Sequence, residues 1–264
     1  MTVQQALARS GIDARESRLL LAEATGFSQA SVIAFPEKRL PAEAQKAFSE
    51  YVCRRKKGEP IAYIVGHKEF YGLDLAVNPA VLIPRPETEL LVDLALERKP
   101  SSVLDLGTGS GAVALAIRKH LPSAKVTAVE ASAAALAVAQ RNATKNGLDV
   151  EFHHGRWFEP LGGRRFDLIV TNPPYVAEGD RHLADLRFEP RGALVAGPEG
   201  LDAIREIVTA AGAFMRPGAW LLLEHGLGQD KAVRELIGGA GLESVTTWPD
   251  LAGIARVSGG RLKS

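Results

Sequence analysis

Residues 166–175 read Phe-Asp-Leu-Ile-Val-Thr-Asn-Pro-Pro-Tyr, an apolar run that stops at an asparagine followed by two prolines. Proline lacks a backbone N–H and has φ fixed near about −65°, so a buried strand cannot continue through Pro173 and Pro174. Asn172 is therefore presented at a strand's carboxyl end, the edge of an open α/β sheet where ligands bind. Its side-chain oxygen and the Pro173 carbonyl give two acceptors beside the Tyr175 ring, which suits a flat –NH2 group. Taken alone, the tetrapeptide is equally well explained as a plain strand terminator.

The composition indicates a folded protein that can bury a sizeable core and has almost no net charge. The chain has 264 residues, 46% of them hydrophobic, and a formal net charge of +1, which gives no strong field for holding a long nucleic acid. Cys53 is the only cysteine, which excludes an intrachain disulfide and favours a reducing cytoplasm. No basic, apolar leader and no apolar run of about 18 residues occurs, so we expect neither secretion nor a membrane span.

The first part of the chain has the spacing of helices. Apolar residues recur at three- and four-residue steps, as over residues 44–52, and glycines and prolines divide the segment into short helices. We therefore predict a small helical domain over residues 1–70. The basic run at residues 54–57 is explained as a cationic last turn of a helix, with an RNA-touching patch as the less favoured alternative.

Residues 58–89 are rich in strand and turn residues. Candidate strands cover residues 60–66, 71–77 and 81–89, and we expect a β-hairpin linker over residues 71–89. Thr88 precedes a helical run over residues 90–98, which predicts a capped helix that opens the second domain.

From residue 102 onward, strand-like and helix-like segments alternate. Repeated βα units predict a doubly wound α/β domain over residues 90–264, with a mainly parallel sheet and helices on both faces. The candidate strands are residues 103–106, 126–130, 150–152, 166–171 and 220–224, with a weakly alternating tail over 243–261 for the last strands. The candidate helices are residues 112–120 and 132–145, and two more that begin at residues 201 and 229.

A glycine loop, Gly107-Thr108-Gly109-Ser110-Gly111, follows the first of these strands. Alternate glycines let the backbone pass close to a ligand where a Cβ would collide. The spacing is neither that of a dinucleotide loop nor that of a P-loop, which favours a nucleoside with a compact charged tail. Glu130 ends the next strand, where an acid can accept hydrogen bonds from both ribose hydroxyls; a solvated charge is the alternative. Asp105 either holds an ammonium group or caps the turn.

The order of glycine loop, acidic strand end and Asn-Pro-Pro-Tyr resembles the class I S-adenosylmethionine-dependent methyltransferases, which have a Rossmann-like fold. The resemblance implies S-adenosyl-L-methionine as cofactor and S-adenosyl-L-homocysteine as product. Trp157 would pack on the purine, although a tryptophan after a strand is also common in cores. The implied cofactor site consists of Asp105, Gly107, Thr108, Gly109, Ser110, Gly111, Glu130, Trp157 and Asn172.

Asn-Pro-Pro-Tyr is shared by enzymes that methylate adenine N6, guanine N2 or the glutamine amide, all planar nitrogens with a delocalised lone pair. The Asn172 side chain and the Pro173 carbonyl would hold such a nitrogen in line with the S–CH3 bond, and Tyr175 would pack against its plane. Asn172, Pro173 and Tyr175 are thus the expected catalytic residues. Together with Pro174 they form the expected substrate site.

Segments outside the motif distinguish these substrates. Residues 58–66, 83–89, 187–190 with 193–194, and 221–226 resemble the bacterial peptide-chain release factor glutamine N5-methyltransferases, the HemK-like or PrmC family. The resemblance covers nearly the whole chain. It implies that the substrate is the glutamine of a Gly-Gly-Gln loop on a release factor, and that the helical domain and the hairpin help to dock that protein. We expect a cytoplasmic protein without a stable nucleic-acid partner, and a monomer by default.

The chain departs from that family at two positions. Glu130 stands where many relatives have an aspartate. Arg156 stands where relatives often have an acid, which argues against a side-chain contact to the adenine amino group but not against a backbone contact. Arg85, Glu87 and Glu89 are candidates for a conformational or substrate-positioning role, with an interdomain ion pair as the simpler interpretation.

Two other functions compete with glutamine methylation. A nucleic-acid N-methyltransferase acting on an exocyclic amine would require a continuous basic groove, which the near-neutral composition does not favour. A non-catalytic module that only binds the cofactor is disfavoured by the intact glycine loop, Glu130 and Asn-Pro-Pro-Tyr.

Overall fold

The computed structural model describes residues 1–264, which form two compact units, Met1–His67 and Lys68–Ser264. The division falls close to the predicted limit at residue 70. No helix in either unit combines the length and the apolar character that a membrane span requires.

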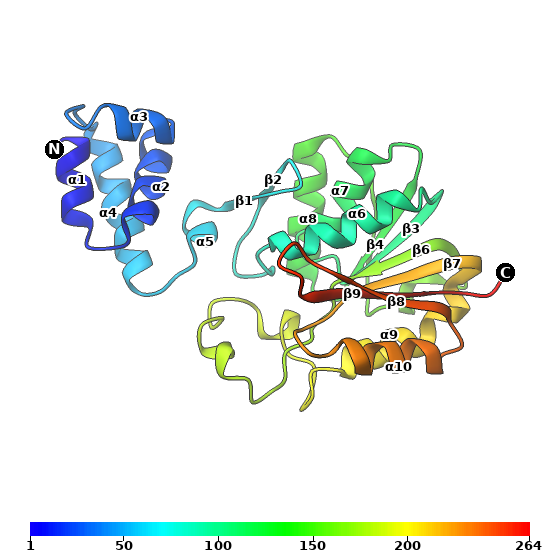
Figure 1. Ribbon diagram of the computed structural model, residues 1–264. Coiled ribbons are helices and arrows are strands. Elements are labelled where there is room, and N and C mark those ends of the chain that lie inside the picture. Colours follow the sequence, from blue (N-terminus) through cyan, green and yellow to red (C-terminus); the bar gives the residue numbers. More distant parts are fainter. The chain divides into compact units, whose positions relative to one another are not determined.

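The first unit is helical, as predicted (Figure 1). Its buried side chains form a core of their own. Thr2 and Gln5 form a capping box at its first helix, and the Asp13 and Ser28 side chains cap the next two. Leu20, Leu21 and Phe48 are among its buried side chains. The helices are α1 (Val3–Ser10), α2 (Ala14–Thr25), α3 (Gln29–Ala34), α4 (Ala42–Lys56) and α5 (Ile61–Val65).

The prediction of a strand over residues 60–66 is wrong, because these residues form α5. Pro60 precedes the helix and Gly66, at φ +84°, ends it in the left-handed conformation. Tyr63 and Ile64 are buried, and α5 packs against α2 and α4. Tertiary packing thus overrides the strand preference of β-branched and aromatic residues.

The arginines at the basic end of α4 form ion pairs within the first unit. The Arg54 guanidinium donates to Glu59, and the Arg55 guanidinium donates to Glu16 at 2.8 Å. Both arginines thus have carboxylate partners, which favours the structural interpretation of this run over an RNA-binding patch.

A hairpin of β1 (His67–Phe70) and β2 (Leu73–Ala76) turns through Tyr71 and Gly72, both at positive φ, as a two-residue hairpin turn requires. Phe70, Leu73 and Leu75 belong to the core of the second unit, so the hairpin is built into that unit.

The predictions for residues 81–89 need two corrections. No strand forms there; a 3-10 turn, η1 (Pro86–Thr88), leads instead into α6 (Glu89–Glu97). The Thr88 side chain makes no capping hydrogen bond. It contacts Asn172 instead, as described below.

The second unit contains a seven-stranded sheet in the order β5-β4-β3-β6-β7-β9-β8. Strands β3 to β7 pair in parallel, and β9 is antiparallel to both β7 and β8, which confirms the mainly parallel sheet. The strands are β3 (Ser102–Leu106), β4 (Lys125–Glu130), β5 (Glu151–His154), β6 (Phe166–Thr171), β7 (Met215–Glu224), β8 (Glu243–Pro249) and β9 (Ala255–Arg261).

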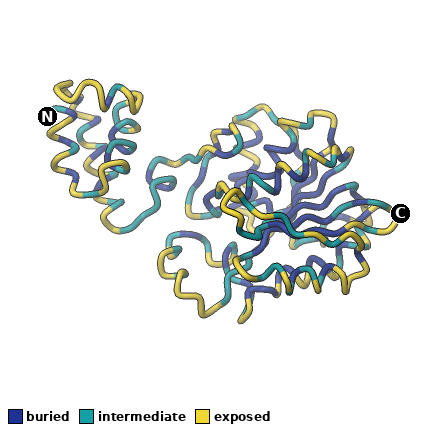
Figure 2. Tube along the Cα trace, in the orientation of Figure 1, coloured by how far each residue is buried: buried dark blue, intermediate teal, exposed yellow.

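Helices cover both faces of this sheet (Figure 1). One face packs with α6, α7 (Ala112–His120) and α8 (Ala133–Asn146), and the other with α9 (Asp202–Ala211) and α10 (Asp230–Gly239). Successive strand residues enter opposite cores, as Leu168 does on one face and Ile169 on the other. Figure 2 shows the strands as the buried centre of the unit.

Register brings the ends of the central strands together. Thr171 of β6 is paired with Leu106 of β3 on one side and with Leu223 of β7 on the other. The residues that follow these three, including Asn172 and Glu224, therefore meet at one edge of the sheet.

Candidate active site

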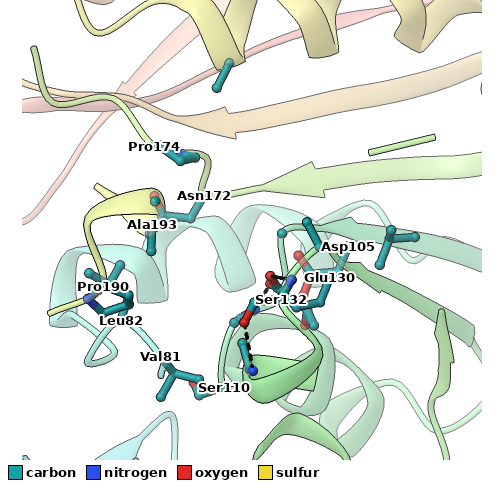
Figure 3. Close-up of a pocket in the computed structure, with 18 of the residues that line it drawn as sticks. Val81, Leu82, Asp105, Ser110, Glu130, Ser132, Asn172, Pro174, Pro190 and Ala193 are labelled. Atoms are coloured by element: carbon teal, nitrogen blue, oxygen red, sulfur yellow. Dashed lines mark hydrogen bonds between the residues drawn. The ribbon is translucent and has the colours of Figure 1, made fainter. Parts of the chain in front are cut away.

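A cavity of about 600 Å³ opens at the carboxyl ends of β3, β4 and β6. Its walls come from the glycine loop, from the ends of the strands, and from two connecting segments, residues 80–85 and 190–196. Figure 3 shows two groups of lining residues that face each other across the cavity. One group contains the acidic residues and the glycine loop, and is labelled at Asp105, Ser110, Glu130 and Ser132. The other contains the Asn-Pro-Pro-Tyr motif and the segment after it, and is labelled at Asn172, Pro174, Pro190 and Ala193.

The glycine loop lines this cavity with backbone. Gly107 and Gly109 have φ of +70° and +56°, a region that side chains with a Cβ rarely adopt. A Cβ on Gly107 would come within 3.2 Å of the Trp157 ring. Gly111 differs from the other glycines of the loop: it packs against Leu115 and Ala139 and does not line the cavity.

Asp105 is buried beneath the loop and lines the cavity. Its Oδ2 accepts hydrogen bonds from the Thr108 hydroxyl at 2.6 Å and from the Ala114 N–H at 3.2 Å, which is the predicted turn-capping role. Burial raises the pKa of Asp105 to about 7, against the opposing effect of these two hydrogen bonds.

Glu130, at the end of β4, is hydrogen-bonded to the glycine loop. Its two carboxylate oxygens accept hydrogen bonds from the Gly109 and Ser132 N–H groups, both at 2.9 Å. Each oxygen has a further lone pair, so these bonds leave capacity for ribose hydroxyls.

Trp157 lines the cavity in a left-handed conformation, at φ +46°. The neighbouring Arg156 guanidinium forms an ion pair with Glu206 and lies 5.5 Å from the Trp157 ring, measured to the ring centroid. The Arg156 N–H donates to Glu159 at 3.1 Å. The Arg156 side chain is thus engaged with the Glu206 carboxylate.

Asn172 has a carboxamide with one end hydrogen-bonded and the other end without a partner. Its Nδ2 donates to the Thr88 hydroxyl at 3.2 Å. Its Oδ1 is buried and has no hydrogen-bond partner. Buried acceptors are normally paired, so this oxygen marks a place where a donor is expected to bind.

The remaining motif residues are placed differently. Pro174 lines the cavity with Asn172, whereas Pro173 and Tyr175 do not. The Tyr175 hydroxyl donates to Oε1 of buried Glu224 at 3.1 Å, and burial raises the pKa of Tyr175. The structure thus brings together eight of the predicted cofactor residues and leaves out Gly111; they are Asp105, Gly107, Thr108, Gly109, Ser110, Glu130, Trp157 and Asn172.

The interdomain ion pair predicted for Arg85 is wrong. Arg85 pairs with Glu189, which lies in the same compact unit, and Oε2 of Glu189 accepts from the Ile83 N–H at 3.0 Å. Glu89 accepts from the Tyr71 N–H at 3.1 Å. The buried Glu189 therefore joins the two connecting segments of the cavity wall.

Sequence reasoning did not place Val81, Leu82 or Ala193 in the site, although residues 83–89, 187–190 and 193–194 carried the family resemblance. The one signal available was Glu189 itself, an acid between Phe188 and Pro190, because a carboxylate inside an apolar stretch needs a partner when it is buried.

Comparison with known families and proteins shows which proteins this chain resembles. The Methyltransferase small domain family matches residues 86–187, and the PrmC N-terminal domain matches residues 2–66. The chain is 48% identical to a release factor glutamine methyltransferase of Burkholderia pseudomallei, over 99% of this chain and 96% of that protein. It is also 48% identical to a Pseudomonas aeruginosa protein of the same name, over 93% and 91% of the two chains.

Solved structures confirm the predicted class I methyltransferase fold. A methyltransferase from Pyrococcus furiosus superposes with a TM-score of 0.60 at 21% identity, covering 82% of this chain and all of that one, a likeness in fold alone. A Thermus thermophilus 16S rRNA N2 methyltransferase, in complex with AdoMet and guanosine, has a TM-score of 0.56 at 25% identity and covers 75% of this chain and 50% of that one.

Proposed function

The chain belongs to the family of the release factor glutamine methyltransferases, and from this premise we propose that it methylates the glutamine of a release factor's Gly-Gly-Gln loop. The methyl donor is S-adenosylmethionine and the acceptor is the side-chain amide nitrogen, N5. The observation that carries the proposal is the buried, unpartnered Oδ1 of Asn172 in the cavity. A primary amide supplies the N–H donor that this oxygen lacks.

The residues of the cavity suit S-adenosylmethionine. Its bare glycine backbone would admit the amino-acid portion, Asp105 would face the ammonium group, Glu130 the ribose and Trp157 the purine. When bound, the cofactor supplies a methyl group on a positively charged sulfur. The product would be S-adenosylhomocysteine.

The contribution of this chain to the reaction is positioning. Asn172 Oδ1 would accept one N–H group of the glutamine amide and hold its nitrogen in line with the methyl group. The Pro173 carbonyl is the second predicted acceptor, although Pro173 is not among the residues that line the cavity. Both acceptors stabilise the positive charge that develops on that nitrogen. The methylated amide then releases a proton to water, so no strong base is required.

Transfer of labelled methyl groups tests the proposal. The purified chain and labelled S-adenosylmethionine are incubated with an unmodified release factor and with a variant whose Gly-Gly-Gln glutamine is replaced. We expect label on the parent release factor alone. Label on neither protein, with transfer to RNA or DNA in a parallel reaction, would instead show a nucleic-acid N-methyltransferase.

We further propose that the helical unit, residues 1–67, helps to dock the release factor. Its α3 helix and the residue after it expose two large apolar side chains, Ile33 at 65% and Phe35 at 51%. Exposed large apolar side chains are candidates for a contact with another protein when they form a patch. The methylation assay tests this with a short Gly-Gly-Gln peptide, for which KM should exceed that for the intact release factor; equal values would contradict docking.

Cofactor binding should strengthen as pH rises through the titration of Asp105. Because burial raises the pKa of Asp105 to about 7, the carboxyl is protonated below that pH and a bound cation must displace the proton. We expect the Kd of S-adenosylmethionine to fall between about pH 6 and pH 8, by at most about tenfold per unit at the acidic end. Isothermal titration across this range measures it.

Two variants make this test specific. Asp105→Asn should bind more weakly with a flat pH profile, whereas the exposed Asp149→Asn should keep the parental slope. A slope that survives in Asp105→Asn would assign the titration to another group, such as a histidine, and contradict the proposed role.

A further inference from the structure

The Asn172 carboxamide can be turned in two ways, and only one of them serves an amide substrate. With Oδ1 toward the substrate, the side chain accepts an N–H; turned by half a rotation, it would present a second –NH2 group and repel the substrate. The structure shows Nδ2 bonded to the Thr88 hydroxyl at 3.2 Å and Oδ1 unpartnered. The hydrogen bond to Thr88 selects this orientation as long as the Thr88 hydroxyl acts as the acceptor.

Thr88 can accept from Asn172 only if its own proton points elsewhere. A hydroxyl has one proton, and the Thr88 side chain makes no capping hydrogen bond at α6. Thr88 lies at the start of α6, which packs over β6 and β7. The group that can take its proton is the buried Glu224 carboxyl. Burial raises the pKa of Glu224, and the Thr88 and Tyr175 hydroxyls act against that shift.

Glu224 stands beside Asn172 because of strand register. Thr171 is paired with Leu223, so the next residues of β6 and β7 are neighbours. Glu224 is 1% exposed; its Oε1 accepts from the Tyr175 hydroxyl at 3.1 Å, and its Oε2 makes no hydrogen bond in the structure, so it can accept one. An isolated buried carboxylate is costly, which is a reason to expect a role for it.

We propose that Thr88 and Glu224 are positioning residues that fix the Asn172 carboxamide with its oxygen toward the substrate amide. Glu224 orients the Thr88 hydroxyl, and that hydroxyl orients Asn172. The same carboxyl holds Tyr175, so one buried group sets both ends of the Asn-Pro-Pro-Tyr motif. This inference rests on the proposed glutamine methylation.

The decisive comparison is between two substitutions of Thr88. Thr88→Val keeps the shape of the side chain but removes the acceptor, and we expect kcat to fall by about tenfold to a hundredfold with the cofactor Kd unchanged. Thr88→Ser restores the hydroxyl and should recover most of the lost rate. Quenched single-turnover methylation of the release factor measures the rate, and titration with the cofactor measures its Kd.

A second variant changes Glu224, the group that orients the Thr88 hydroxyl. In Glu224→Gln the new –NH2 group can donate to Thr88, whose proton is then given to Asn172 and turns the carboxamide around. We therefore expect kcat to fall in Glu224→Gln while the cofactor Kd stays parental. This variant also decides the matter if Thr88→Val fails to fold.

Several outcomes would overturn the inference. They are parental kcat in Thr88→Val or in Glu224→Gln, failure of Thr88→Ser to recover the rate, and a loss of cofactor affinity as large as the loss of kcat. The parent enzyme is assayed alongside; if it too fails to methylate the glutamine, the proposed function falls instead.

Discussion

Replacing Asn172 by alanine is expected to lower kcat for glutamine methylation by about a thousandfold, while the cofactor Kd changes by no more than about threefold. The substitution removes the one buried side-chain acceptor of the cavity residues that has no partner. The nitrogen of an amide is a weak nucleophile, so the reaction depends on holding it in line and on stabilising its developing charge. Alanine does neither, although it leaves the glycine loop and Glu130 in place.

Single-turnover transfer of label to a release factor, together with cofactor titration, separates these two effects. Asn146→Ala is a matched control, because Asn146 also donates a side-chain hydrogen bond, to the Asn142 carbonyl at 2.9 Å, but lies outside the cavity. Undiminished turnover in Asn172→Ala would contradict the mechanism. An equal loss in Asn146→Ala would indicate damage to the fold instead.

The architecture of the site was predictable because it depends on local patterns. Alternating apolar strands and helices determine a parallel sheet, and in such a sheet the strand ends meet at one edge. The glycine loop, Glu130 and Asn172 each end or follow a strand, so their convergence on one cavity follows from the sequence.

Contacts between distant segments were not predictable in the same way. Asn172 bonds to Thr88, which is 84 residues away, and Arg85 pairs with Glu189, which is 104 residues away. No periodicity encodes which irregular segments meet. Thr88 shows the consequence, since local rules predict a helix cap whereas the tertiary structure assigns its hydroxyl to Asn172.

Tyr175 shows a second limit. Two prolines before it fix the backbone, and the side chain leaves the cavity to reach Glu224 on β7. The prediction that its ring packs against the substrate amide stays a prediction. The hydrogen bond from its hydroxyl to the buried Glu224 carboxyl holds the motif on the side away from the cavity. The sequence did not predict this contact.

Gly200→Ala is expected to destabilise the protein by about 3 kcal/mol and to lower kcat in the remaining folded protein by at least about tenfold. Gly200 has φ +73°, and a Cβ there would overlap the carbonyl oxygen of Tyr175. That carbonyl also accepts from Gln229 Nε2 at 3.0 Å, so it cannot move without breaking this hydrogen bond. Displacing Tyr175 would carry the whole Asn-Pro-Pro-Tyr turn with it.

Gly197→Ala is the matched control for this effect. Gly197 has nearly the same φ, +74°, but a Cβ there would meet the side-chain carboxylate of Asp202, which is 59% exposed and can turn away. It should therefore cost only the left-handed backbone strain, about 1–2 kcal/mol, and retain near-parental kcat. Urea unfolding and single-turnover rates of both variants measure the difference. Equal effects at the two glycines would show that backbone strain alone matters, and that the Tyr175 carbonyl does not fix the position of the motif.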